Sequence, residues 1–284
     1  NIASLLIKLE ELDEAKTVYN SLLPSPVFEN EIYHNLAIIS IKLHDYKKAI
    51  GYLRKINYAD NKKSIDLYYN FCVAYSSLNE ADSAEFYFQK SLTENAKWNG
   101  QQKNIQYGLI LKYKGDEFAK QHQYKEATSQ YQQAIVQFQN DFKETESQKN
   151  PEQFSGIFSF INLFNTLAAK AAAFEAWYQQ KKDIELLKVS LQTYHSAFKL
   201  AGYVEKTYNS DEARLFLGKL KYIVHSKPID VSLLLYNITQ KRNYLEDAYR
   251  FDQLNKASIL AFNVQENDLR STINEANELL HKES

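Results

Sequence analysis

The sequence predicts an all-α protein built as an α-solenoid, a stack of about seven antiparallel helix pairs. Three observations predict this fold class. Glycine and proline are scarce, with 7 and 4 among 284 residues, whereas sheet proteins need them at their many tight turns. No segment shows the alternation of apolar and polar residues that is typical of a half-buried strand. A short pattern also returns at a nearly constant interval through the first half of the chain.

The pattern is a polar amide followed by an apolar and then a small residue. It begins at Asn1, Asn35 and Asn70, so the intervals are 34 and 35 residues. A second small residue recurs with the same period, and a large residue follows it four positions later: Ala15 with Tyr19, Ala49 with Leu53, and Ala84 with Phe88. A period of this length indicates stacked structural units.

Each unit is predicted to be two short amphipathic helices joined by a tight turn. The small residue marks the point where the two helices approach closely, because a large side chain there would force them apart. Neither helix can bury its apolar face alone, so neighbouring units must stack. A fourth unit follows with an insertion, and the residues expected to pack between helices are therefore Ala15, Ala49, Ala84, Ala127, Tyr131 and Ala134.

The second half of the chain is predicted to consist of longer helix pairs that continue the first half. Residues 1–142 hold the units of regular length, the polar stretch 143–152 is the predicted linker, and residues 153–284 hold the longer pairs. We expect Asp183 to cap the second helix of this half and Pro228 to lie in the first turn of the fourth. A kink within a helix is the alternative for Pro228. The expected helices span 153–180, 184–201, 211–225, 228–241, 243–263 and 267–282.

The fourth unit resembles a tetratricopeptide repeat in the spacing of its glycine, aromatic and alanine residues. The matching residues are Tyr113-Lys114-Gly115-Asp116-Glu117-Phe118, His122-Gln123-Tyr124-Lys125-Glu126-Ala127, Tyr131 and Ala134. The resemblance implies a right-handed superhelix whose first helices line a concave groove that binds a protein or peptide. In this register Asn1 is the sixth residue of a first helix, so we expect the natural chain to begin further upstream.

A second resemblance covers residues 160–265, which are similar to the helical region before the protease-like domain of bacterial CHAT proteins, a caspase-related family. The carrying residues are Tyr208-Asn209-Ser210-Asp211-Glu212-Ala213-Arg214, Tyr244-Leu245-Glu246-Asp247-Ala248-Tyr249 and Asn255-Lys256-Ala257-Ser258-Ile259-Leu260. The resemblance implies an adjoining peptidase domain as an intramolecular partner. Nothing of that domain's Cys–His pair is found in this sequence.

The recurring amides are candidates for ligand contact. Asn35 and Asn70 precede packing residues and would point about 100° away from the buried stripe of their helices. A side-chain amide both donates and accepts, so a row of them could bond an extended peptide backbone. The residues expected to flank this groove are His34, Tyr69, Lys42 and Lys112. Alternatively, the amides cap or bridge adjacent helices and meet no ligand.

Composition excludes several other functions. The chain has 34 basic and 35 acidic residues, so charge gives no reason to expect nucleic acid or an anionic membrane as a partner. No apolar run approaches the roughly 18 residues of a membrane span. A single cysteine fits a reducing, cytoplasmic location.

Catalytic and metal-binding patterns are also missing from the sequence. Cys72 occupies a small-residue slot of the repeat and is expected to be a buried packing residue rather than a nucleophile. No two of the six histidines lie three or four positions apart, as a helical metal pair would require. A hydrolase would need a convergent set of titratable groups, which this sequence does not offer. We therefore expect no cofactor and no enzymatic activity.

The sequence thus predicts a non-catalytic scaffold that binds a protein or peptide in its groove. Through the CHAT resemblance, it would be the regulatory or substrate-recruiting part of a peptidase. The alternative is a structural or oligomerisation module whose many aromatic residues, 21 Tyr and 16 Phe, are buried in contacts between copies of the chain.

Overall fold

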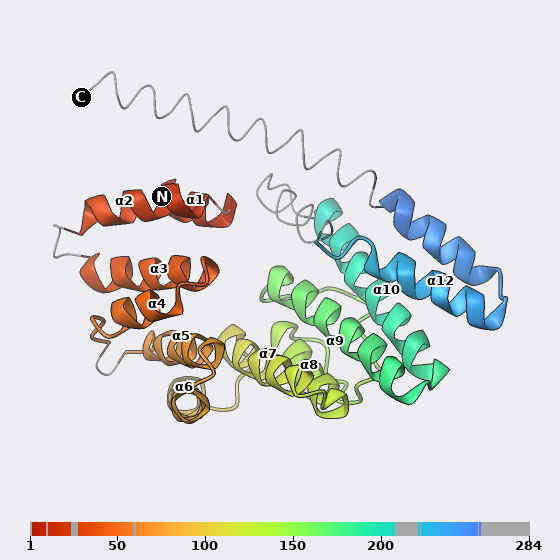
Figure 1. The fold of residues 1–284 in the computed structure, drawn as a ribbon, viewed down its shortest axis with the longest axis horizontal. Coiled ribbons are helices and arrows are strands. Elements are labelled where there is room, and N and C mark those ends of the chain that lie inside the picture. Colours follow the sequence, from red (N-terminus) through yellow and green to blue (C-terminus); the bar gives the residue numbers. More distant parts are fainter. Residues whose placement is uncertain are drawn as a thin grey trace, which may run out of the picture. The chain divides into compact units, whose positions relative to one another are not determined.

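The computed structural model describes residues 2–9, 11–23, 28–58, 61–207, 221, 223–254 and 256. All regular secondary structure in these residues is helical (Figure 1). Extended segments pair at one isolated antiparallel bridge in this part of the chain, between Gln139 and Ile157. The prediction of an all-α fold is confirmed.

The first compact unit comprises residues 1–113. From α1 to α6, each helix packs against the next in sequence, and α3 also contacts α5, the first helix of the next pair. A chain in which every helix pair touches only its neighbours is the arrangement of a helical solenoid. The helices are α1 (Ile2–Leu9), α2 (Leu12–Leu22), α3 (Glu29–Lys42), α4 (Tyr46–Leu53), α5 (Ser64–Ser77), α6 (Ala81–Asn99) and the first half of α7 (Ile105–Lys120).

The second compact unit comprises residues 114–284. Helix α9 packs against both α8 and α10, and α10 packs against α12. The division between the units falls inside α7, earlier in the chain than the polar stretch 143–152. After the end of α7, the helices of this unit are α8 (Tyr124–Phe138), α9 (Phe160–Lys181), α10 (Ile184–Thr207), α12 (Lys227–Thr239) and residues 243–254.

Helix ends in the second unit follow local chemistry. The Asp183 carboxylate accepts a hydrogen bond from the Glu185 backbone N–H at 3.0 Å, which caps α10 as expected. Pro228 lies in the first turn of α12, where its missing N–H costs nothing. The expected helices over 211–225 and 267–282 lie, apart from a few residues of the first, outside the described residues.

Helix α9 begins at Phe160, later than the expected residue 153. The backbone before it pairs with the residues that follow α8, since the Asn140 N–H donates to the Gly156 carbonyl at 2.9 Å. Ser159 then caps α9. The polar stretch 143–152 is held against the helices as well: the Gln132 amide donates to the Glu144 carbonyl at 2.7 Å, and the Ser196 hydroxyl donates to the Pro151 carbonyl at 2.7 Å.

Three helix pairs are closed by the same turn. His44, Asn79 and His122 each adopt a left-handed conformation with φ of 60°. In the first of these turns the His44 N–H donates to the Ile41 carbonyl and the Asp45 N–H to the Ser40 carbonyl. This is the Schellman pattern that satisfies the last carbonyls of a helix. Glycine usually occupies the left-handed position, and none of these turns has one.

The small residues of the repeat lie where the helices meet. The six residues expected to pack between helices are all buried, with at most 5% of their surface exposed: Ala15, Ala49, Ala84, Ala127, Tyr131 and Ala134. Cys72, which holds the position in α5 that Ala37 holds in α3, is also buried, with 1% of its surface exposed.

Helices α7 and α8 approach each other closely at Gly115. A Cβ atom at this position would lie 2.7 Å from two ring carbons of Tyr131. The Tyr131 ring cannot move away easily, because it is buried and its hydroxyl donates to the Asp116 carboxylate at 2.8 Å. Burial next to that carboxylate strongly raises the pKa of Tyr131.

Replacing Gly115 with Ala should destabilise the protein by about 1–3 kcal/mol, because the added methyl group overpacks the Tyr131 ring. Gly202 is the matched control: it lies in α10 of the same unit, and a Cβ there would meet nothing within 4 Å. Gly202→Ala should stabilise by roughly 0.5–1 kcal/mol through lower chain entropy. Urea unfolding curves measure both; similar effects for the two variants would contradict the close approach.

Lys170 is buried at the centre of the second unit. None of its surface is exposed, and its Nζ donates to the Gln132 side-chain oxygen at 2.6 Å and to the Lys149 carbonyl at 2.9 Å. The ammonium therefore joins α9 to α8 and to the polar stretch 143–152. Its partners are neutral, so no carboxylate compensates for desolvation, and burial lowers the pKa of Lys170 to about 7.

The stability of the protein should therefore rise with pH above about 7. Between this folded pKa and the ordinary value of 10.5, the unfolded chain binds one proton more at Lys170, which favours folding by roughly 1 kcal/mol per pH unit. The Lys170→Met variant should lose this increase. Lys181→Met, at an exposed site on the same helix, should retain it. Urea unfolding of all three proteins at pH 7.5 and 9.5 measures the difference, and equal pH dependence in all three would contradict a neutralised Lys170.

Candidate functional site

The candidate groove residues lie on α3, α5 and the first half of α7, all within residues 1–113. We call this surface the α3–α5–α7 face and define it by seven half-buried residues: His34, Asn35, Asp66, Tyr69, Asn70, Gln106 and Tyr113. Because α3, α5 and α7 are the first helices of consecutive pairs, their side chains can meet across the pair boundaries.

Side chains on this face connect the first helices to one another. The Asn70 amide nitrogen lies 2.8 Å from His34 Nε2, which joins α5 to α3. Asp66 forms a side-chain hydrogen bond with Gln106 of α7. The rings of Tyr69 and Tyr113 meet edge to face with centroids 6.4 Å apart. Polar and aromatic contacts thus link α5 to both α3 and α7.

The ionisation of His34 fits its contact with Asn70. An amide N–H group donates, so His34 Nε2 must accept, which requires a neutral imidazole with its proton on Nδ1. Burial, with a smaller contribution from the Lys63 ammonium, lowers the pKa of His34 and so favours this neutral form. Lys63 itself pairs with Glu31 at 2.5 Å.

Burial shifts the pKa of Asp66 on this face and of Tyr58 beside it. Burial raises the pKa of Asp66, although its hydrogen bond to Gln106 opposes the shift. Tyr58, in the connection between α4 and α5, packs its ring edge to face with His34 at 6.0 Å. Burial raises the pKa of Tyr58 to about 12, and its hydroxyl has no hydrogen-bond partner among the described residues.

The structure brings only some of the sequence-derived candidates into contact with one another. His34 and Asn70 are hydrogen-bonded, and Tyr69, which precedes Asn70 on α5, contacts Tyr113. Asn35 is half-buried, and its amide donates to the Glu31 carbonyl of its own helix at 2.9 Å. Lys42, the last residue of α3, is exposed, and Lys112 is half-buried on α7.

Tyr58 and Gln106 were not among the sequence-derived candidates. Tyr58 lies in a connection, where helical periodicity carries no information. Gln106 is the second residue of α7, and the recurring amide pattern of the first three units does not occur at this position.

The described residues hold no group of three His, Cys, Asp or Glu side chains arranged to bind a metal ion. No helix in the described part of the chain combines the length and apolar character needed to cross a bilayer.

Comparisons with known proteins detect one tetratricopeptide repeat. The family model matches residues 65–97, which are α5 and most of α6. A comparison with curated protein sequences gives no significant match.

Among solved structures, the chain is similar to BtubC (BKLC) from P. vanneervenii, with a TM-score of 0.43, 12% identity, and coverage of 95% of this chain and 92% of that one. A tetratricopeptide repeat protein from Parabacteroides merdae gives a TM-score of 0.38 at 13% identity, covering 90% and 96%. The TPR2AB-domain:pHSP90 complex of yeast Sti1 gives 0.29 at 15%, covering 90% and 95%. The family match identifies the helix pair α5–α6 of the first unit as a tetratricopeptide repeat.

Proposed function

We propose that the chain is a non-catalytic scaffold that binds a protein or peptide along the α3–α5–α7 face. Tetratricopeptide repeats bind protein and peptide partners, and the repeat at residues 65–97 supplies the central helix of this face. The observation that carries the proposal is that two side-chain amides on this face are held in place with hydrogen-bonding groups to spare. Asn35 and Asn70 each use one N–H group in the contacts described above.

Each of these amides keeps hydrogen-bonding capacity for a ligand. A side-chain amide has two donors and an acceptor oxygen, so one N–H and the oxygen of Asn35 and of Asn70 can still bond a peptide backbone. The protein contacts hold each side chain in one orientation. A ligand therefore meets groups that are already ordered, and less entropy is lost on binding. Bridging of adjacent helices and ligand contact are compatible roles for the same amide.

We further infer that this scaffold serves an adjoining CHAT peptidase as its regulatory or recruiting part. Support comes from the resemblance over residues 160–265, of which the stretch Tyr244–Tyr249 lies in the helical residues 243–254. The other carrying stretches, 208–214 and 255–260, lie outside the described residues except for Lys256. A caspase-like coding segment directly downstream of this one would support the assignment, and an unrelated segment there would oppose it.

Replacing Asn35 and Asn70 together with Ala should weaken peptide binding by roughly 1–3 kcal/mol, about 5- to 150-fold, if both amides bond the ligand. Peptides would first be selected from a random display library on the immobilised protein, and their affinities then measured by fluorescence anisotropy. The matched control is Asn20→Ala with Gln89→Ala, two exposed amides on the second helices α2 and α6, which should leave affinity unchanged.

Selected peptides that bind both double variants like the wild type would overturn the assignment of the face. Circular dichroism spectra of the variants check that the helices persist. A stable dimer in light scattering that dissociates when Asn35 and Asn70 are replaced would instead favour the oligomerisation module.

A further inference from the structure

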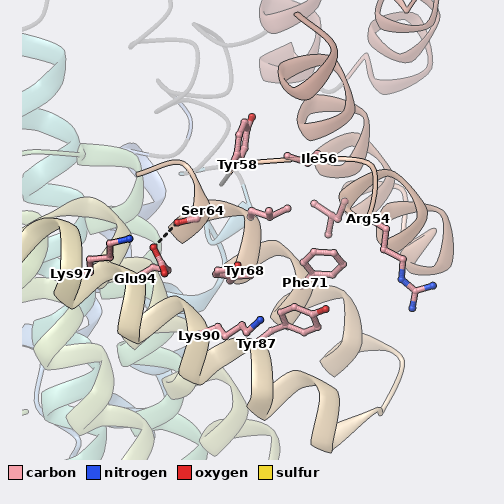
Figure 2. Close-up of a pocket in the computed structure, with 12 residues that line it drawn as sticks. Arg54, Ile56, Tyr58, Ser64, Tyr68, Phe71, Tyr87, Lys90, Glu94 and Lys97 are labelled. Carbon is pink, nitrogen blue, oxygen red and sulfur yellow. Dashed lines mark hydrogen bonds between the residues drawn. The ribbon is translucent and has the colours of Figure 1, made fainter. Parts of the chain in front are cut away.

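A hollow of about 340 Å³ lies in the first unit between the end of α4, α5 and α6 (Figure 2). Its α5 residues are Ser64, Leu67, Tyr68 and Phe71, which form one stripe at helical spacing. Asp66 and Asn70 of the α3–α5–α7 face are centred about 130° away around the helix, because each residue advances it by about 100°. Tyr58 contributes to both places, since it lines the hollow and packs against His34.

One wall of the hollow is a stack of aromatic rings. Phe71 and Tyr87 are stacked with centroids 4.4 Å apart and planes inclined by 14°. Tyr87 continues the stack to Tyr75 at 5.5 Å and contacts Tyr68 at 6.1 Å. Phe71 is buried, whereas Tyr68 and Tyr87 are half-buried. Figure 2 shows Phe71 and Tyr87 side by side, one from α5 and the other from α6. This wall is preformed, since its rings are fixed by one another.

The rim of the hollow is positively charged. Arg54, Lys90 and Lys97 line it, with Glu94 as the one carboxylate among the lining residues. Glu94 is already engaged: its carboxylate accepts from the Ser64 hydroxyl at 2.9 Å and from the Trp98 indole N–H at 3.1 Å. Figure 2 shows Lys90, Glu94 and Lys97 along the same helix, α6.

The Lys90 ammonium is available for an anion. Its contacts in the described part of the chain are with the rings of Tyr68, at 5.1 Å, and Phe86, at 4.7 Å. Such cation–π contacts orient the ammonium without neutralising it. Lys90 is exposed, so a carboxylate arriving at the rim can pair with it while an adjacent apolar group reaches the aromatic wall.

We propose that this hollow binds an acidic peptide segment of a partner protein, anchored by one large apolar or aromatic side chain. The volume lies at the lower end of the 300–1,000 Å³ of small-ligand pockets, which suits one large side chain and its neighbours. The anchor packs against Tyr68, Phe71 and Tyr87, where ring contacts add to the burial of area. The flanking carboxylates pair with Lys90 and Lys97, which favours fast association and rejects basic segments.

The test uses fluorescein-labelled peptides and fluorescence anisotropy. The sequence Glu-Asp-Phe-Asp-Glu should bind the wild type saturably with a Kd below about 1 mM. The neutral peptide Gln-Asn-Phe-Asn-Gln and the unanchored peptide Glu-Asp-Ala-Asp-Glu should each bind more weakly by about tenfold, because each lacks one of the two recognised groups. Added salt should weaken the acidic peptide most, since exposed ion pairs are screened.

Protein variants separate the hollow from general charge attraction. Lys90→Gln with Lys97→Gln should weaken binding of the acidic phenylalanine peptide about 3- to 30-fold. Lys47→Gln with Lys48→Gln removes the same charge from exposed positions of α4 outside the hollow and should change affinity less than about twofold. Tyr68→Ala should weaken binding without altering the circular dichroism spectrum.

The result also distinguishes this site from the α3–α5–α7 face. The variant lacking the Asn35 and Asn70 amides should bind the acidic phenylalanine peptide like the wild type. The proposal is overturned by any of three outcomes: no saturable binding up to about 1 mM, equal binding of the acidic and neutral peptides, or equal losses in the two lysine pairs.

Discussion

Close approach between neighbouring helices is the constraint on which the rest of this structure depends. A short amphipathic helix is stable only when its apolar face is covered, and here the adjacent helices cover it. Gly115, Ala127 and their counterparts in other pairs keep that contact tight. The polar groups of the first helices can meet across pairs for the same reason: His34 of α3 reaches Asn70 of α5 only because the two helices touch.

Helix α5 illustrates how one element serves two surfaces. Its stripe through Leu67 and Phe71 is apolar and joins the aromatic stack with Tyr87 of α6. Its other stripe, through Asp66 and Asn70, carries half-buried polar groups, and desolvation raises the pKa of Asp66. The apolar contacts fix the axis of the helix, and the fixed axis holds the polar groups in register with those of α3. A rigid hydrophobic interior thus supports a polar surface on another side of the same helix.

Much of the fold could be predicted because the repeat is encoded locally. Small residues at a constant interval marked the positions that the structure buries, and Asp183 and Pro228 marked helix starts through their own hydrogen-bonding chemistry. Features that depend on tertiary contact could not be predicted. The delayed start of α9 results from backbone pairing with the end of α8. Lys170 stands in a run of alanines, where periodicity gives no sign that its ammonium is buried against Gln132.

The candidate site, too, could be predicted only in part. Helical register identified His34 and Asn70 as neighbours of the packed stripe, but the contact between them depends on how two pairs dock. Tyr58 and Gln106 carried no sequence signal, and the aromatic hollow combines residues from three successive helices and a connection. Such convergence of residues distant in sequence arises from packing geometry, which a single sequence does not reveal.

The shared left-handed turns at His44, Asn79 and His122 determine where insertions and deletions in the sequence can be accommodated. They fix where each second helix starts relative to the first, whereas the second helices themselves differ greatly, from 8 residues in α4 to 19 in α6. Insertions and deletions are therefore accommodated at the far end of each hairpin, and the closed end acts as a common anchor. New loops can accumulate along one edge of the stack while the docking of successive pairs is preserved.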